Sequence, residues 1–154
     1  MGRSSTWTAG YWLRCEEAVS GQLSAVSGQR SDGAEMKDFR RLQVWQKAHL
    51  LTLKVYEATR KFPKEELYGL TTQMRKNSSS IPTNIAEGCG RGGDTEFARF
   101  LQIAMGSASE LGYELILSRD LHYLSLDEYE SLNQDTVEVK RMLAPFIRKL
   151  KAEC

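Results

Sequence analysis

Four consecutive segments of this chain space their apolar and small residues three and four positions apart. Residues at that spacing lie on one face of an α-helix, which must be buried against a partner. The four stripes are Leu42, Trp45, Ala48, Thr52, Val55, Thr59 and Phe62; Leu67, Leu70, Met74, Ser78, Ile81, Ile85 and Gly88; Phe97, Phe100, Ala104, Ala108, Leu111, Leu115 and Ser118; and Tyr129, Leu132, Thr136, Val139, Leu143, Phe146 and Leu150. No strand-like alternation competes with them, so the pattern predicts an all-α fold.

The connections between these segments are short. Residues 63–66, 88–94 and 123–126 join the segments in turn. Short connections make consecutive helices antiparallel neighbours. We therefore predict an antiparallel up-down-up-down four-helix bundle over residues 37–154.

Side chains in two of the connections fit helix ends. Gly88 is expected to end the second helix and Asp94 to cap the third, because glycine favours helix C-termini and aspartate favours N-caps. Ser125 or Asp127 is expected to cap the fourth helix for the same reason.

Two prolines fall inside the predicted helices. Pro82 lacks the amide that would bond to the Ser78 carbonyl, and Pro145 lacks the amide for Arg141. We expect kinks near both prolines, because a straight helix would cost about 3 kcal/mol at each. The hydroxyls of the serines at 78–80 are expected to satisfy freed carbonyls.

The run from Ser78 to Phe97 consists mostly of small residues, and two interpretations compete. Its glycines at 88–93 could bind phosphate through their amides, but the Lys-Ser/Thr of a P-loop is missing and no strand precedes them. The favoured interpretation is a helix end, a turn and a helix start. The serines at 78–80 also have two interpretations. Close packing against residues 106–109 of the third helix is favoured, and a ligand groove is the alternative.

The first 36 residues differ in composition from the rest. They are rich in Ser and Gly, and Ala18-Val-Ser-Gly-Gln22 recurs as Ala25-Val-Ser-Gly-Gln29. Their apolar residues show no helical period and no signal-peptide core. We predict a disordered extension over residues 1–36, or a misassigned one if Met36 is the natural start, followed by the bundle domain at 37–154.

Composition excludes several classes of protein. No apolar run approaches the roughly 18 residues that a membrane span needs, so we expect no membrane partner. Cys15, Cys89 and Cys154 are far apart and odd in number, which argues against a disulfide framework and against paired zinc ligands. A reducing cytoplasm is the simplest setting.

Candidate catalytic groups are sparse. His49 and His122 fall on different helices without an adjacent nucleophile. Glu110 and Glu114 are one turn apart, without the Glu-x-x-His pattern of a di-metal bundle. We therefore predict that the chain is not an enzyme and has no catalytic residues, no cofactor and no metal site.

Basic residues are the remaining functional lead. Residues 36–99 hold 12 Lys or Arg and 7 Asp or Glu, a charge of +5, whereas residues 100–154 hold 6 and 9, a charge of −3. The candidate nucleic-acid contacts are Arg40, Arg41, Lys47, Lys54, Lys61, Arg75, Lys76 and Arg91. Binding through such charges falls steeply with salt and carries little sequence specificity. The same division of charge also fits head-to-tail self-association, or two ordinary solvated faces.

Several motifs, in order and spacing, resemble those of one family. They are Asp38-Phe-Arg-Arg-Leu-Gln-Val-Trp45, Ala48, Phe62-Pro63, Tyr68-Gly-Leu70, Gln73-Met-Arg75, Ser80-Ile-Pro-Thr-Asn-Ile-Ala-Glu-Gly88, Gly90-Arg91 and Phe100-Leu-Gln-Ile-Ala-Met-Gly-Ser-Ala-Ser-Glu-Leu111. The chain resembles the bacterial four-helix bundle protein family, also called 23S rRNA intervening-sequence proteins, over residues 37–151.

The resemblance implies a kinked antiparallel bundle that assembles into a homo-oligomeric ring, a pentamer, and it implies no enzymatic activity. The fold is also similar to the accessory variability protein of diversity-generating retroelements, a basic pentamer that binds nucleic acid and a reverse transcriptase. This chain departs from that protein in being nearly neutral, with a net charge of +1.

The structural signature of the family is expected at Asn84, Glu87, Gly88, Gly90 and Gly106. Among these, Glu87 is expected to be a buried acid with a structural hydrogen bond beside Asn84.

Two hypotheses for the function follow. The first is a non-enzymatic oligomeric scaffold that contacts nucleic acid, structured RNA in particular, through the basic surface of the first two helices. The alternative is a protein–protein interaction module without a nucleic-acid role, in which Arg75 and Arg91 serve subunit contacts against the acidic half.

Overall fold

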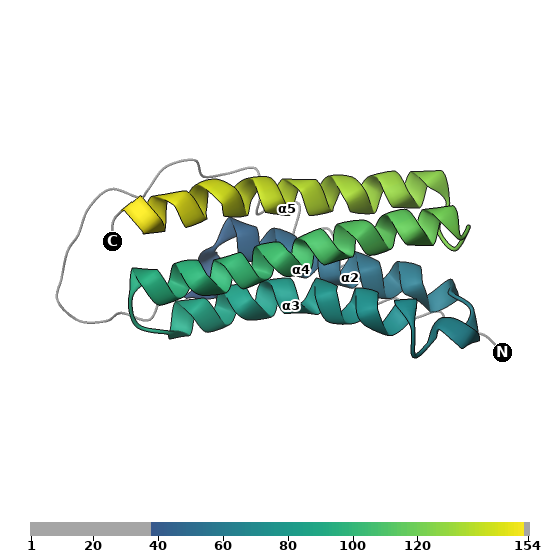
Figure 1. The fold of residues 1–154 in the computed structure, drawn as a ribbon, viewed down its shortest axis with the longest axis horizontal. Coiled ribbons are helices and arrows are strands. Elements are labelled where there is room, and N and C mark those ends of the chain that lie inside the picture. Colours follow the sequence, from purple (N-terminus) through teal and green to yellow (C-terminus); the bar gives the residue numbers. More distant parts are fainter. Residues whose placement is uncertain (1–37, 153–154) are drawn as a thin grey trace. The chain divides into compact units, whose positions relative to one another are not determined.

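The computed structural model describes residues 38–152, which form four long helices packed side by side (Figure 1). The long helices are α2 (Gln43–Ala58), α3 (Leu70–Gly90), α4 (Asp94–Asp120) and α5 (Leu126–Ala152), and the short 3₁₀ turns are η1 (Phe39–Arg41), η2 (Thr59–Lys61) and η3 (Lys64–Glu66). Helix α3 packs between α2 and α4, and α5 packs between α4 and α2. The predicted all-α, up-down-up-down four-helix bundle is confirmed.

The predicted extension at residues 1–36 lies outside the described residues. None of the helices in residues 38–152 combines the length and the apolarity that crossing a membrane requires.

The predicted stripes form the core of the bundle. The completely buried apolar side chains are Ala48, Leu51, Val55, Met74, Ile81, Ile85, Leu101, Ala104, Ala108, Leu111, Leu115 and Leu143. Leu67 is an exception, because it is 47% exposed and precedes α3. The carboxylate of Glu66 accepts a hydrogen bond of 3.0 Å from the Leu70 amide, which fixes the start of α3 three residues later than its stripe predicted.

Helix α3 continues through Pro82, which has no amide to donate to the Ser78 carbonyl. A side chain of α2 donates a hydrogen bond to this carbonyl instead. The hydroxyl of Thr52 lies 2.8 Å from the Ser78 carbonyl and 2.9 Å from the Ala48 carbonyl of its own helix. The expectation that the neighbouring serines would satisfy the freed carbonyl is wrong. Ser78 and Ser79 instead donate to carbonyls one turn back on α3.

The glycine-rich turn joins α3 to α4, as the favoured interpretation of the sequence predicted. A Cβ on Gly88 would lie 2.7 Å from the Phe97 ring and 2.9 Å from the Phe100 Cβ, so this glycine permits the close approach of the two helices. The helix ends differ from the prediction, since α3 extends to Gly90 and Asp94 is the first helical residue of α4.

The small residues predicted to pack between α3 and α4 include one hydrogen-bonded pair, and Ser78 and Ala108 are completely buried. The hydroxyls of Ser80 and Ser107 are 2.9 Å apart and hydrogen bonded. Gly106 does not contribute to close packing, because a Cβ there would meet no atom within 4 Å.

The start of α5 is capped by Ser125, one of the two predicted residues. The Glu128 amide donates to the Ser125 hydroxyl, and the Glu128 carboxylate accepts from the Ser125 amide at 2.9 Å. This reciprocal arrangement is a capping box, which satisfies donors that the helix end would leave unpaired.

Candidate nucleic-acid interface

Three of the predicted nucleic-acid contacts lie in one row along α2 and the η2 turn that follows it, facing α5. Lys47, Lys54 and Lys61 are seven residues apart and therefore share a helix face. Their ammonium groups pair with acids of α5 at 2.8, 2.6 and 2.5 Å, respectively. The acids are Glu138, Asp135 and Glu128. We call these three ion pairs the α2–α5 ladder.

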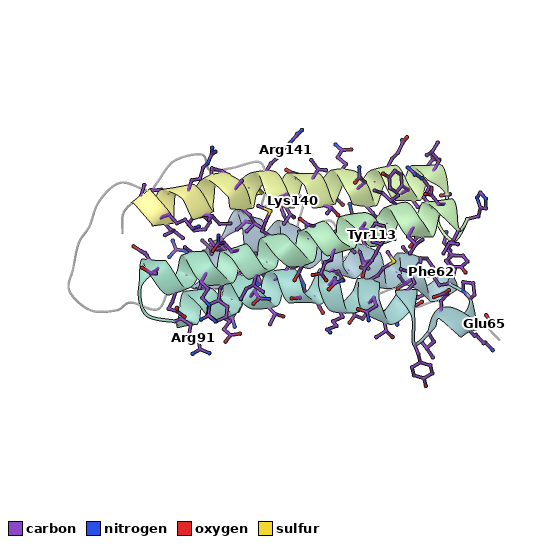
Figure 2. All side chains as sticks on the ribbon, viewed as in Figure 1. Phe62, Glu65, Arg91, Tyr113, Lys140 and Arg141 are labelled. Atoms are coloured by element: carbon purple, nitrogen blue, oxygen red, sulfur yellow. The ribbon has the colours of Figure 1, made fainter. Side chains whose placement is uncertain are left out.

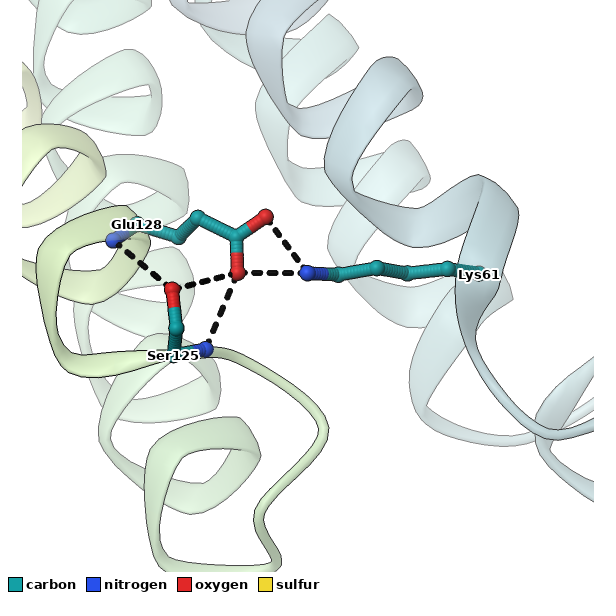
Figure 3. A network of polar contacts seen from close by, with 3 residues as sticks. All are labelled: Lys61, Ser125 and Glu128. Atoms are coloured by element: carbon teal, nitrogen blue, oxygen red, sulfur yellow. Dashed lines mark hydrogen bonds and ion pairs between the residues drawn. The ribbon is translucent and has the colours of Figure 1, made fainter.

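The last pair of the ladder is tied into the cap of α5 (Figure 3). The Lys61 ammonium reaches both carboxylate oxygens of Glu128, while Ser125 donates to the same carboxylate. The hydrogen bond from Lys61, with those from Ser125, lowers the pKa of Glu128 from 4.5 to about 2. The carboxylate is therefore ionised and fully engaged at neutral pH.

The ladder brings the basic and acidic halves of the sequence together within one chain. Each lysine of the row faces a carboxylate, so the row presents little net positive charge to a phosphate backbone. The charge pattern left open nucleic-acid contact, head-to-tail self-association and two ordinary solvated faces. Pairing of these charges within one chain corresponds most closely to ordinary solvated faces. Pairs this exposed contribute only about 0–1 kcal/mol each.

The neighbouring residues Arg75 and Lys76 on α3 are placed differently. Arg75 donates from Nε to the Thr59 hydroxyl at 2.8 Å, and its guanidinium lies 5.1 Å from the centre of the Tyr56 ring. It therefore helps join α3 to the end of α2. Lys76 is exposed and forms no ion pair with the described residues.

The other predicted contacts lie where α2 begins and α3 ends. Arg40 and Arg41 are exposed on η1, which packs against both helices. Arg91 follows α3 on the same end of the bundle (Figure 2), where it pairs with Glu87 at 2.7 Å. Arg91 and Arg99 also lie 5.6 and 5.9 Å from the centre of the Phe100 ring.

The last turns of α5 add further basic residues at this end. The Phe97 and Phe146 rings meet edge to face at 5.2 Å, which places the end of α5 beside the start of α4. We define the basic end as Arg40, Arg41, Arg91, Arg99, Arg148, Lys149 and Lys151. The acids Asp38, Glu87, Asp94 and Glu96 lie on the same turns, where Glu87 forms an ion pair with Arg91 and Glu96 forms one with Arg99. Sequence reasoning missed Arg99 and the α5 residues because it grouped charges by position along the chain.

The signature residues serve the α3–α4 contact to different degrees. Asn84 donates to the Ser80 carbonyl one turn back, at 2.8 Å. Glu87 is exposed, so the expectation of a buried acid at this position is wrong. A Cβ on Gly90 would meet no atom within 4 Å.

The buried acid of the α3–α4 contact is Glu114, which is 9% exposed. Its Oε1 accepts a hydrogen bond of 2.7 Å from Asn77, whereas its Oε2 has no hydrogen-bond partner among the described residues. Burial raises the pKa of Glu114 to about 7; the Asn77 bond lowers it and the charge of Glu110 raises it. The sequence signal was available, because Glu114 continues the core spacing of Ser107 and Leu111.

A groove of about 690 Å³ runs over this acid on the surface of α3 and α4. It is lined by Glu66, Leu70, Gln73, Asn77, Ser109, Glu110, Tyr113, Glu114, Leu117 and Leu121. Tyr113, which is labelled in Figure 2, is 65% exposed at its edge.

The two histidines are not brought together. The His49 ring stacks on Trp45 at 5.2 Å, and His122 follows α4 at the opposite end of the bundle from η1. His122 lines an open hollow with Lys61 and Arg119, but ion pairs to Glu128 and Asp120 occupy these two cations. Among residues 38–152, no group of His, Cys, Asp or Glu is arranged to hold a metal ion.

Comparisons with known proteins agree with the fold. The family model for the 23S rRNA-intervening sequence protein matches residues 40–145. A crystal structure of a protein with unknown function from the S23 ribosomal protein family of Bacteroides thetaiotaomicron VPI-5482 matches with 25% identity and a TM-score of 0.64. The match covers 68% of this chain and 97% of that one. No curated protein matches the sequence significantly.

Proposed function

Because the chain belongs to the 23S rRNA-intervening sequence protein family, we propose that it is a non-enzymatic, oligomeric bundle protein that contacts structured RNA through its basic end. The contact is electrostatic and of low sequence specificity, and it takes place in the cytoplasm. This proposal moves the RNA contact from the row of lysines on α2 to the end of the bundle.

One observation carries the choice of surface. The ladder lysines each face an acid of α5 within 2.5–2.8 Å, whereas Arg40 and Arg41 form no ion pair with the described residues. Phosphate binding gains from cations whose charge is not already matched by a neighbouring carboxylate. The family name supports RNA as the polyanion, since it associates these proteins with 23S rRNA.

The test compares two triple variants that remove the same number of charges. The first replaces Arg40, Arg41 and Lys149, basic-end residues that form no ion pair with the described residues, by Gln, and the second replaces Lys47, Lys54 and Lys61 by Gln. Filter binding to a stem-loop RNA is measured between about 50 and 200 mM salt, where phosphate contacts lose affinity steeply. The basic-end variant is expected to lower the salt slope by about 3, and the ladder variant by less than about 1.

Two results contradict the proposal. Wild-type protein that retains no RNA at about 50 mM salt, where such contacts are strong, excludes RNA contact. An equal loss of slope in both variants excludes the basic end as the site.

A second candidate, a protein-interaction module, is favoured by the outward face of α4. Ile103, Tyr113 and Ile116 of α4 and Leu121, which follows it, are 42%, 65%, 39% and 44% exposed. Exposed apolar side chains grouped on one element are typical of an interaction surface. We propose that this face packs on further copies of the chain, which would build the oligomer implied by the resemblance. An unchanged sedimentation profile for Ile103→Glu combined with Leu121→Glu would contradict this assembly mode.

A further inference from the structure

We infer that the groove between α3 and α4 is a binding site for an organic cation, a guanidinium or primary ammonium group on a short apolar stem, held by the Glu114 carboxylate. The inference is independent of RNA contact, because the basic end contributes no residue to this groove.

The charges that line the groove are all of one sign. Glu66, Glu110 and Glu114 contribute carboxylates, and the lining contains no Lys, Arg or His. Glu66 is already engaged, since its two oxygens accept from the Leu70 amide and the Tyr123 hydroxyl. Glu110 is exposed to solvent. Glu114 is therefore the acid with the most to gain from a bound cation.

The Oε2 atom of Glu114 shows what kind of group is required. It is buried and has no hydrogen-bond partner among the described residues, while Oε1 is satisfied by Asn77. When Glu114 is ionised, Oε2 is an acceptor without a donor; when it is protonated, Oε2 carries a proton without an acceptor. A buried group in either condition costs about 1–3 kcal/mol. A ligand that brings both a positive charge and an N–H donor satisfies the ionised form.

The rest of the groove fits the stem of such a ligand. Leu70, Leu117 and Leu121 provide an apolar wall, and the Tyr113 ring is available for a cation–π contact. Oε2 is buried, so binding requires a movement of the groove lining, in which Tyr113 and Gln73 are exposed side chains. The volume of about 690 Å³ is within the range of small-ligand sites.

Binding is expected to depend on pH. Asn77 from α3 bonds to Glu114, and the other polar or titratable groups of the groove lining are Gln73 from α3, Ser109, Glu110 and Tyr113 from α4, and Glu66 from η3. None of them supplies a cation, so the empty site favours the protonated acid and the bound cation favours the ionised one. Affinity should therefore rise between pH 6 and pH 8, across the pKa of about 7.

The experiment is an NMR titration of the Glu114 carboxyl carbon in the full chain. The probes are n-butylguanidinium chloride and n-butylurea, a neutral analogue of similar shape, at constant ionic strength. Butylguanidinium should give a saturable change and lower the pKa of Glu114 by about one unit or more, as expected for a carboxylate beside a cation. Butylurea should leave that pKa unchanged.

Two variants locate the effect. Glu114→Gln keeps an acceptor for Asn77 and should weaken butylguanidinium binding at least about tenfold, whereas Glu110→Gln removes the same charge one turn away and should change it by less than about threefold. If Glu114→Gln does not fold, the wild-type titration is still decisive. Equal binding of the two probes, or equal losses in the two variants, overturns the inference.

Sedimentation of the wild-type protein distinguishes two sources of the cation. A fall in mass at saturating butylguanidinium identifies a basic side chain from a second copy of the chain as the natural occupant. An unchanged mass identifies a free organic cation.

Discussion

The α2–α5 contact and the α3–α4 contact place their polar groups in opposite ways. Between α2 and α5, three lysines meet three carboxylates at the surface, and the paired side chains are 28–49% exposed. Between α3 and α4, side chains meet through hydrogen bonds: Ser80 meets Ser107, and the Asn77 amide meets the buried Glu114.

This difference teaches that the number of charges across a contact is a poor guide to its energetic weight. An exposed ion pair exchanges protein partners for water at little cost, so its loss is nearly neutral. A buried polar group cannot replace a lost protein partner by water, so a substitution beside it leaves a strained contact or a polar atom without a hydrogen bond. The following predictions measure the contrast, in order of decreasing effect.

Gly88→Ala should cause the largest loss of stability. The added Cβ would lie 2.7 Å from the Phe97 ring and 2.9 Å from the Phe100 Cβ, so α3 and α4 must move apart. We expect about 2–3 kcal/mol of destabilisation in urea unfolding, typical of overpacking. The matched control is Gly106→Ala, which adds the same atom in open space and should stabilise by about 0.5–1 kcal/mol. Similar effects at both glycines would contradict the close contact.

Glu114→Gln should stabilise the protein by about 2 kcal/mol at pH 8. The folded-state pKa of about 7 lies above the ordinary 4.5, so the folded wild type binds the extra proton and loses stability as pH rises from 4.5 to 7. Above pH 7 the penalty is complete, and near pH 4 the two proteins should be equally stable. Urea unfolding at pH 4, 6 and 8 checks this; a difference that does not vary with pH would exclude a buried titrating acid.

Thr52→Val tests a buried bond between α2 and α3. The variant leaves the Ser78 carbonyl, freed by Pro82, without its hydroxyl donor, and we expect a loss of about 1–2 kcal/mol. Thr136→Val is the control, because that buried hydroxyl donates to the Leu132 carbonyl of its own helix. Thermal unfolding of the two variants should differ clearly, and equal melting temperatures would show that the interhelical bond contributes nothing.

Glu128→Gln should have the smallest effect, about 1 kcal/mol or less at pH 7, because its pair with Lys61 is exposed. The folded-state pKa of about 2 lies below the ordinary 4.5, so the stabilisation is present above pH 4.5 and is lost as pH falls toward 2. Denaturant unfolding from pH 2 to 7 measures the difference between variant and wild type. A difference as large at pH 2 as at pH 6 would rule out the ionised pair as its cause.

The fold could be predicted because helical periodicity is a local property of sequence. The stripe through Ala48, Thr52 and Val55, for example, directly gives the buried face of α2. Helix ends were predicted less well, because they depend on single side chains. The Glu66 carboxylate, for example, accepts from the Leu70 amide, so α3 begins at Leu70 and not at Leu67, where its stripe of apolar residues begins.

The partners of the polar side chains could not be read from the sequence. The acids that face the lysines of α2 lie 67 to 91 positions away, and only the packing of α5 on α2 selects them. The basic end was missed for the same reason, because Arg148 and Lys149 belong to a stretch of net negative charge. Glu114 was considered as half of a carboxylate pair with Glu110, although its place in the core spacing of α4 marked it as buried.

The regular spacing of the ladder has one further consequence, for how the helices find their alignment. If α2 slid by seven residues along α5, Lys47 would face Asp135 and Lys54 would face Glu128, so two of the three pairs would form again. The ladder therefore permits more than one register. The hydrogen bond from the Thr52 hydroxyl of α2 to the Ser78 carbonyl of α3 involves a single position of α2, and no such shift reproduces it. The alignment of α2 in the bundle is therefore specified by this unrepeated contact and not by the ladder.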